Sequence, residues 1–276
     1  PDGVNFDEPL SVMGIKDNLL RERYDGDLWL RFTFDASAEY IKSAENLRIS
    51  VEPMNVKEVR VNGSEIYEIP GAWWFDKKFK VYDILPYAKE GRNEITIKLH
   101  HWQRDYVYYV LYSGVSESLR NCLVFDCEVE DIYLLGDFCV KCDGKFTDGE
   151  RRSVLFDGKF SLEPQRDEIH ISDIVTDGYP FYAGHFKSSF VYNYSEGMPT
   201  VLKLTGRYAV CDVTVNGSEA GTLMFSNYLD LSDHLREGKN EIILNMCNSN
   251  RNQIGRAQSE LQSPLNLVCR LLLEKK

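Results

Sequence analysis

The stretch VRVNGSE at positions 59–65 returns with one change as VTVNGSE at positions 213–219. A second pair of matching segments follows each copy, EGRNEI at 90–95 and EGKNEI at 237–242. Asn-Gly supplies two residues that tolerate positive φ, which a tight type I′ hairpin turn requires. Each copy therefore predicts a β-hairpin, followed after a spacer by another turn and an outgoing strand.

The spacer between the two segments differs in length between the copies. The first segments are 154 residues apart and the second segments 147, so the first copy holds seven additional residues. Both spacers end in a stretch where Asp precedes an aliphatic residue, at 79–85 and 228–235. The additional residues therefore fall between Ile66 and Phe79, where we expect a longer loop.

Alternating polar and apolar residues fill much of the remaining chain. The period of two is clear at 28–34, 47–51, 94–99 and 186–192, and it is typical of strands with one buried face. Helical segments are expected only at 9–20, 36–44 and 252–260, and the aromatic stretch 106–112 is interpreted as a strand. The predicted fold class is all-β.

Two copies of one hairpin signature about 150 residues apart indicate two domains of one fold rather than a solenoid of small repeats. We predict two tandem jelly-roll β-sandwich domains of the galactose-binding-domain-like type, residues 1–120 and 121–276. The stretch 113–118 is the expected linker, and a strand at 132–135 is expected to open the second domain.

Composition narrows the classes of partner. The formal net charge is -11, so the chain is poorly suited to phosphate backbones or anionic lipid surfaces. No apolar run reaches the length of about 20 residues that a membrane helix needs. The chain begins at Pro1 without an initiator Met, which suggests a piece cut from a longer protein. We therefore expect neither nucleic acid nor a membrane as a partner.

The seven cysteines are an odd number in a chain too long for a small disulfide scaffold, which favours free thiols in a reducing compartment and leans towards a cytoplasmic location. Cys139 and Cys142 have the spacing of a zinc or redox pair. In a strand, however, residues three apart point to opposite faces, so we expect no metal there. No acidic loop has calcium-ligand spacing, and we predict no cofactor.

The ordered set Val-Asn-Gly, Asp-x-Leu and Gly-x-Asn-Glu-Ile resembles the sugar-binding jelly-roll domain of family 2 glycoside hydrolases. The stretches IYLLGDF at 132–138 and GYPFYAG at 178–184 resemble the C-terminal β-sandwich region of bacterial α-L-rhamnosidase-like glycoside hydrolases. This resemblance implies carbohydrate and the catalytic domain of the same polypeptide as partners. It also implies that the catalytic carboxylates lie outside this chain, so no catalytic residue is predicted here.

Aromatic side chains beside polar ones are the candidate carbohydrate contacts, because an indole ring stacks on the apolar face of a sugar while polar neighbours bind its hydroxyls. Packing against a neighbouring domain is the alternative role for Trp73 and Trp74, covering the sheet opening for Tyr182, and an edge or packing role for His185. Trp73 and Trp74 fall in the predicted loop extension. The other predicted sugar-binding residues are Trp102 with Arg104 and Asp105, and Tyr182 with His185.

Paired carboxylates are the other feature that glycoside chemistry requires. Asp83 and Asp233 are interpreted as equivalent, turn-capping residues rather than as catalysts. Three functions therefore remain open, in order of preference: a non-catalytic, carbohydrate-associated region of a larger glycoside hydrolase, a free-standing lectin-like protein, and a complete glycoside hydrolase.

Overall fold

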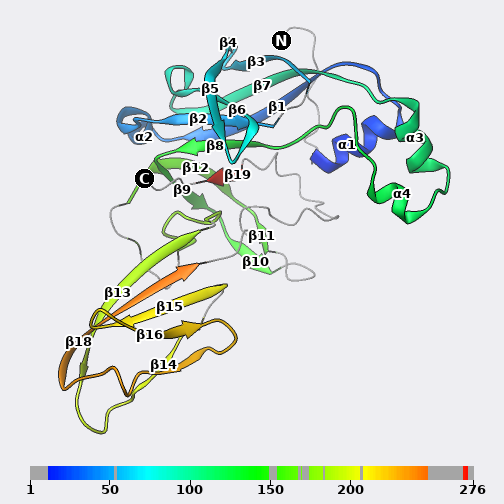
Figure 1. Cartoon of the computed structure of the whole chain (residues 1–276). Helices are drawn as coiled ribbons and strands as arrows, with labels where there is room; N and C mark the ends of the chain where they lie inside the picture. The colour runs from blue at the N-terminus through cyan, green and yellow to red at the C-terminus, as the bar shows by residue number, and fades with distance from the viewer. Residues whose placement is uncertain are drawn as a thin grey trace. The chain divides into compact units, whose positions relative to one another are not determined.

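The computed structural model describes residues 12–52, 55–148, 154–166, 169, 174–182, 184–205, 208–247 and 270–272. The chain forms two compact units (Figure 1). Among the described residues, unit 1 contains those up to 169 together with 174–180 and 270–272, and unit 2 contains those from 181 to 247. Strands dominate both units, which confirms the all-β class.

Among the described residues, helices are short and occur in unit 1. The helices of the described chain are α1 (Val12–Arg21), α2 (Ala38–Ser43), the 3-10 helix η1 (Leu85–Tyr87), α3 (Asp105–Tyr112) and α4 (Glu117–Asn121). The expected helices at 9–20 and 36–44 correspond to α1 and α2, whereas the one at 252–260 lies outside the described residues. None of the described helices is long and apolar enough to cross a membrane.

Two sheets build unit 1, and a separate hairpin joins β10 to β11. The first sheet has the order β4-β3-β7-β1-β12-β9 and the second the order β19-β8-β2-β6-β5. The bounds are β1 (Gly26–Ala36), β2 (Leu47–Val51), β3 (Val56–Val61), β4 (Ser64–Ile66), β5 (Glu68–Trp74), β6 (Asp76–Asp83), β7 (Gly91–His101), β8 (Ile132–Gly136), β9 (Phe138–Asp143), β10 (Phe146–Asp148), β11 (Val154–Phe156), β12 (Lys159–Pro164) and β19 (Arg270–Leu272).

The core of unit 1 comes from alternate residues of these strands. Leu30, Phe32 and Phe34 of β1 are buried, as are Ile95 and Ile97 of β7. The second sheet buries its own alternate residues in the same way, among them Ile49, Val51, Ile132 and Leu134. The alternate burial along β1 is what the period of two in the sequence predicted, whereas the second sheet also buries residues of its other face, such as Ser50 and Val81.

Unit 2 contains a four-stranded sheet in the order β13-β18-β15-β16 and a two-stranded sheet, β14-β17. Its core includes Cys211, Val213, Val215, Leu244 and Met246. The bounds are β13 (His185–Tyr194), β14 (Val201–Lys203), β15 (Val210–Val215), β16 (Ser218–Leu223), β17 (Tyr228–Asp230) and β18 (Gly238–Cys247).

The hairpin signature of unit 1 is closed by side-chain amides. Asn62 and Gly63 have φ of 49° and 86°, as the turn requires. Asn93 is fully buried, and its Oδ1 accepts hydrogen bonds from Asn62 Nδ2 at 2.9 Å and from the Lys89 backbone at 2.8 Å. Asn62 Oδ1 accepts from the Glu94 backbone at 3.0 Å. The two asparagines thus join the hairpin to the start of β7.

Unit 2 repeats this network atom by atom. Asn216 and Gly217 have φ of 51° and 83°. Asn240, also fully buried, accepts from Asn216 Nδ2 at 2.8 Å and from the Arg236 backbone at 2.9 Å. Asn216 Oδ1 accepts from the Glu241 backbone at 3.1 Å. The sequence repeat is therefore a shared hydrogen-bonding motif that closes one sheet in each unit.

The turn after the Asp-containing strand corrects one sequence interpretation. Asp83 Oδ1 accepts a hydrogen bond from the backbone of Leu85 at 3.1 Å, and in unit 2 the same bond runs from Ser232 to Asp230 at 2.9 Å. Asp230, not Asp233, is therefore the counterpart of Asp83. Its capping role is the one expected.

The division into units differs from the boundary expected between residues 120 and 121. Strand β8 was expected to open the second domain, yet it pairs with β2 from Leu47↔Gly136 to Val51↔Ile132. Strand β12 pairs with β1 at Asp35 and Ala36. Both strands thus extend the sheets of unit 1, and unit 2 begins later in the chain.

Residues 106–112 form helix α3 instead of the expected strand. Burial of Val107, Tyr108 and Val110 follows a helical spacing rather than alternation. Asp126, distant in sequence, accepts a hydrogen bond from the Arg104 backbone at 2.9 Å at the helix N-terminus. The β-branched and aromatic residues favour a strand locally, and this tertiary cap together with packing overrides that preference.

Candidate functional site

The described part of unit 1 contains a pocket at the edge where its two sheets meet, and we call this the edge pocket. Its volume is about 350 Å³. Strand β4 belongs to the first sheet and β5 to the second, so the chain crosses between the sheets at Tyr67. The lining residues are Val51, Glu52, Val56, Lys57, Glu58, Val59, Glu65, Ile66, Tyr67, Glu68, Lys80 and Tyr82.

Strand β5 is built from the region of the seven additional residues. The prediction of a loop between Ile66 and Phe79 is therefore wrong, because these residues form an edge strand that pairs with β6. The register jumps from Glu68↔Tyr82 to Trp73↔Lys80, so β5 bulges away from its partner between these pairs. Unit 2 has a turn between β16 and β17 in place of β5. The strand that forms this wall of the pocket therefore comes from the seven residues that the first copy has and the second lacks.

Cross-strand neighbours project from the same face of a sheet. Glu68 therefore shares a face with Tyr82, and Trp73 shares it with Lys80. Tyr82 and Lys80 both line the edge pocket, and the Lys80 ammonium lies 3.3 Å from the Glu68 carboxylate. Trp73 thus projects from the sheet face that borders the pocket, with 53% of its surface exposed.

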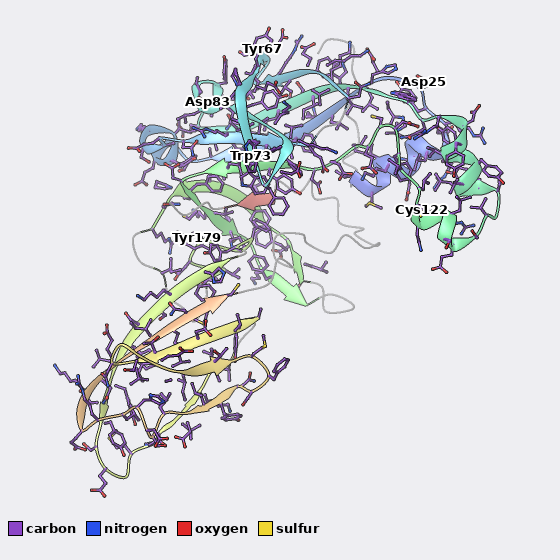
Figure 2. The ribbon with its side chains drawn as sticks, in the orientation of Figure 1. Asp25, Tyr67, Trp73, Asp83, Cys122 and Tyr179 are labelled. Carbon is purple, nitrogen blue, oxygen red and sulfur yellow. The ribbon has the colours of Figure 1, made fainter. Side chains whose placement is uncertain are left out.

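Two tyrosines frame the pocket. Tyr67 is 76% exposed, and its hydroxyl group bonds to the Glu65 carboxylate, whose charge raises the pKa of the phenol. Tyr82 is buried, and desolvation followed by the charge of Glu68 raises its pKa. Tyr67 and Trp73 lie at opposite ends of β5 (Figure 2), so aromatic surface is available at both ends of this edge strand.

Glu52 carries the most unusual carboxylate of the pocket. It is half-buried, and desolvation raises its pKa, with the neighbouring Glu130 and Glu128 adding to the effect and Lys16 opposing it. Among the described residues, Glu52 makes no ion pair. A carboxylate in this setting is able to accept hydrogen bonds from a ligand without first leaving a protein partner.

Trp74 lies apart from Trp73, because adjacent residues of a strand face opposite sides. Its ring packs against Tyr133 with a centroid distance of 5.1 Å, and against Phe75 and Phe79 at 5.6 and 6.2 Å. Three further rings thus surround Trp74. The predicted pair of loop tryptophans is therefore divided between the pocket side of the sheet and an aromatic cluster on the other side.

The second predicted group lies at the end of β7. Trp102 is 39% exposed. Arg104 is paired with Asp126, with 3.0 Å between Nε and Oδ1, and Asp105 is the first residue of α3. Arg104 and Asp126 together fix the start of the helix, which is a structural role. Neither Trp102, Arg104 nor Asp105 lines the edge pocket.

The third predicted group, Tyr182 and His185, belongs to unit 2. The Tyr182 hydroxyl donates to the His185 carbonyl, and the Tyr182 ring packs over Gly184, which has a φ of 151°. His185 is the exposed first residue of β13 and pairs with Cys247. The pair forms a local turn, and the imidazole ring remains accessible.

Metal-binding features are sparse in the described chain. No group of three or more His, Cys, Asp or Glu side chains there is placed to hold a metal ion. The six described cysteines form no disulfide. Cys139 is buried in β9, where desolvation raises the pKa of its thiol.

Sequence reasoning missed the pocket residues Glu52, Tyr67, Glu68 and Lys80. Glu52, Tyr67 and Glu68 lie at strand ends and Lys80 lies inside β6. The sequence separates them by up to 28 positions, and only sheet pairing brings them together. The seven-residue extension was the available signal, although it pointed to a loop.

Comparison with known proteins gives low similarity. No family model matches the chain, and no curated protein matches its sequence. Among solved structures, the α-L-rhamnosidase of Streptomyces avermitilis, complexed with L-rhamnose, has 12% identity over 81% of this chain and a TM-score of 0.27. A rhamnosidase from Novosphingobium sp. PP1Y has 16% identity over 93% and a TM-score of 0.25. A β-glucuronidase from glycoside hydrolase family 2 has 11% identity over 82% and a TM-score of 0.26.

These three structures are glycoside hydrolases, and the matches cover 22%, 24% and 20% of their respective chains. The chain therefore spans about a fifth to a quarter of their length. With TM-scores this low, the likeness carries no conclusion about the activity of this chain.

Proposed function

We propose that this chain is a non-catalytic, carbohydrate-binding β-sandwich region of a larger glycoside hydrolase, and that unit 1 binds sugar at the edge pocket. The observation that carries the proposal is the concave site of about 350 Å³, with carboxylates inside and with Tyr67 and Trp73 at the two ends of its edge strand. A small-molecule site combines concavity, apolar surface and a few convergent polar groups.

The chemistry of the lining suits a polyhydroxylated ring. Carboxylate oxygens of Glu52 and Glu68 accept hydrogen bonds from sugar hydroxyl groups, and the Lys80 ammonium donates to them. Val51, Val56 and Ile66 add apolar wall. The exposed faces of Tyr67 and Trp73 offer stacking surface for the apolar side of a pyranose. The volume lies at the lower end of the usual range, which fits one sugar unit better than an extended chain.

The assignment to a larger glycoside hydrolase rests on the sequence resemblance of the repeated motif and of the stretch 132–138. The complete reading frame tests this part. A catalytic barrel encoded beside these residues supports the proposal, whereas a reading frame without one favours the free-standing lectin-like alternative.

Calorimetric titration of the purified chain with mono- and oligosaccharides tests sugar binding itself. We expect saturable binding that Trp73→Ala weakens by about tenfold, because one aromatic contact contributes about 1.5 kcal/mol. Trp102→Ala is the matched control, since Trp102 is an exposed tryptophan of the same unit that belongs neither to the pocket nor to its edge strand β5. Loss of binding in Trp102→Ala alone, or no binding of any sugar, contradicts the proposed site.

A complete glycoside hydrolase is the second candidate, and the raised pKa of Glu52 beside other carboxylates is the observation in its favour. General acids of glycosidases have raised pKa values and a second carboxylate nearby. Hydrolysis of aryl glycosides by the purified chain, abolished in Glu52→Gln, establishes this alternative and refutes the non-catalytic role.

A further inference from the structure

The charges in the edge pocket are unequal. Four glutamates line it, Glu52, Glu58, Glu65 and Glu68, against two lysines, Lys57 and Lys80. An excess of carboxylates in a concave site sets up a negative potential, because the low-dielectric walls focus the field. The ligand that the pocket accepts therefore depends on how far this excess is already neutralised within the protein.

Ion pairs neutralise only part of it. Lys80 is paired with Glu68 at 3.3 Å, and Glu58 is paired with Arg60. Lys57 is 2.7 Å from Asp27, a carboxylate that does not line the pocket, so its charge is shared with a group outside. Two carboxylates of the lining, those of Glu52 and Glu65, then have no cationic partner among the described residues.

The surroundings of these two carboxylates add negative charge. Glu130, which is itself paired with Lys16, acts on Glu52 as a like charge together with Glu128 and Asp131, and Lys16 opposes them. Glu65 accepts a hydrogen bond from Tyr67, which supplies a dipole and no charge. A protonated amine entering the pocket gains charge-assisted hydrogen bonds there, whereas an entering carboxylate meets like charges.

We propose that the edge pocket prefers a sugar that carries a protonated amino group, a hexosamine, over the neutral sugar of the same ring, and that it rejects the corresponding uronic acid. Glu52 and Glu65 are the residues that recognise the ammonium group. This inference rests on the proposed sugar binding and names the class of sugar for the same site.

Four methyl glycosides separate the inference from the proposed function when titrated calorimetrically against the full chain. They are those of glucose, glucosamine, N-acetylglucosamine and glucuronic acid. We expect glucosamine to bind at least tenfold more tightly than glucose. N-Acetylglucosamine, which keeps the nitrogen and loses the charge, does not share this advantage, and glucuronic acid binds more weakly than glucose. High salt reduces the glucosamine advantage, because the charges of the pocket rim are screened.

Variants assign the effect to residues. Glu52→Gln lowers the ratio of glucosamine to glucose affinity, and Glu65→Gln does the same from the exposed hairpin, where a folding defect is not expected. Glu90→Gln, an exposed glutamate outside the pocket, leaves the ratio unchanged. Equal affinity for glucosamine and glucose overturns the inference while sugar binding stands. Failure of all four sugars to bind overturns the proposed sugar site, and the inference falls with it.

Discussion

Units 1 and 2 close one sheet with the same hydrogen bonds, yet they differ in what surrounds that sheet. The strand orders β4-β3-β7-β1 and β16-β15-β18-β13 match, and so do the pairs β2-β6 and β14-β17. In unit 1, β8 adds to β2, β12 adds to β1 and β5 adds to β6. Among the described strands of unit 2, no strand takes any of these three places.

The added strands go with a more completely covered sheet. The common motif places Ser50 and Val81 of unit 1 in register with each other, as it does Lys203 and Tyr228 of unit 2. Ser50 and Val81 are buried, whereas Lys203 and Tyr228 are exposed. The comparison shows that the motif specifies which backbone groups pair. The strands added at the edges then decide which faces are buried and where a pocket forms.

The largest expected effect on stability comes from two phenylalanines that occupy equivalent strand positions in the two units but differ in burial. Phe32 and Phe190 pair with Ile95 and Ile242, the last residues of the repeated EGxNEI segments. Phe32 is fully buried, whereas Phe190 is 40% exposed. We expect Phe32→Ala to lower the free energy of unfolding by about 3–5 kcal/mol, as for a large core truncation, and Phe190→Ala by less than half of that.

Urea unfolding of both variants measures this difference. Phe225→Ala, at an exposed position of unit 2, is the control and should change stability by less than about 0.5 kcal/mol. Equal costs at Phe32 and Phe190 contradict the view that the added strands, rather than the motif, determine how well the core is covered.

A nearly equal effect in the two units is expected at the buried asparagines. Asn93 Nδ2 donates to the carbonyls of Lys89 and Gly91 at 2.7 and 3.0 Å, and Asn240 repeats both bonds in unit 2 at 2.7 and 2.9 Å. Replacing either asparagine with Ala leaves several polar groups without partners. We therefore expect the free energy of unfolding to fall by about 3 kcal/mol in each unit.

Amide hydrogen exchange resolves the two cases. Asn93→Ala should lower protection in β3 and β7, and Asn240→Ala in β15 and β18, by similar factors. Asn18→Ala, in helix α1 and outside the motif, is the control. If only one of the two asparagines proves important, the shared hydrogen bonds do not have a shared energetic role.

Much of the fold could be predicted because its signals are local. The Asn-Gly turns adopt the positive φ values that the sequence requires, and the alternation at 28–34 and 94–99 corresponds to β1 and β7. The unit boundary could not be found in this way. Periodicity shows that 132–135 is a strand, but the choice of β2 as its partner is a long-range contact that no local pattern encodes.

The candidate site divides in the same manner. Trp73 was singled out because it falls in the seven-residue extension, where an indole ring offers stacking surface for a sugar, and its strand pairing places it on the face that borders the edge pocket. Glu52 and Tyr67 carry no sequence signal of their own, since a lone glutamate or tyrosine at a strand end is common. Arg104 was chosen for its aromatic neighbour, and its ion pair with Asp126 depends on a helix that the sequence pattern did not indicate.

The smallest expected effect concerns Asp230, whose pKa is lowered mainly by the hydrogen bond from the Ser232 backbone and further by the Thr200 and Ser232 side chains. A carboxylate with a lowered pKa in the folded state stabilises that state above its unfolded pKa of about 3.8, and this stabilisation is lost as the pH falls through the lower folded value.

Unit 2 should therefore lose stability below about pH 4. Asp230→Asn should make this dependence shallower, because asparagine keeps a side-chain acceptor and does not titrate. Asp233→Asn, three residues further on, is the matched control, because Asp233 is the counterpart of Asp83 that the sequence suggested. Hydrogen exchange in β17 between pH 5 and 3 measures both slopes, after correction for the intrinsic exchange rate. If Asp230→Asn keeps the slope of the unchanged protein while Asp233→Asn makes it shallower, the structural equivalence of the turns after Asp83 and Asp230 is contradicted.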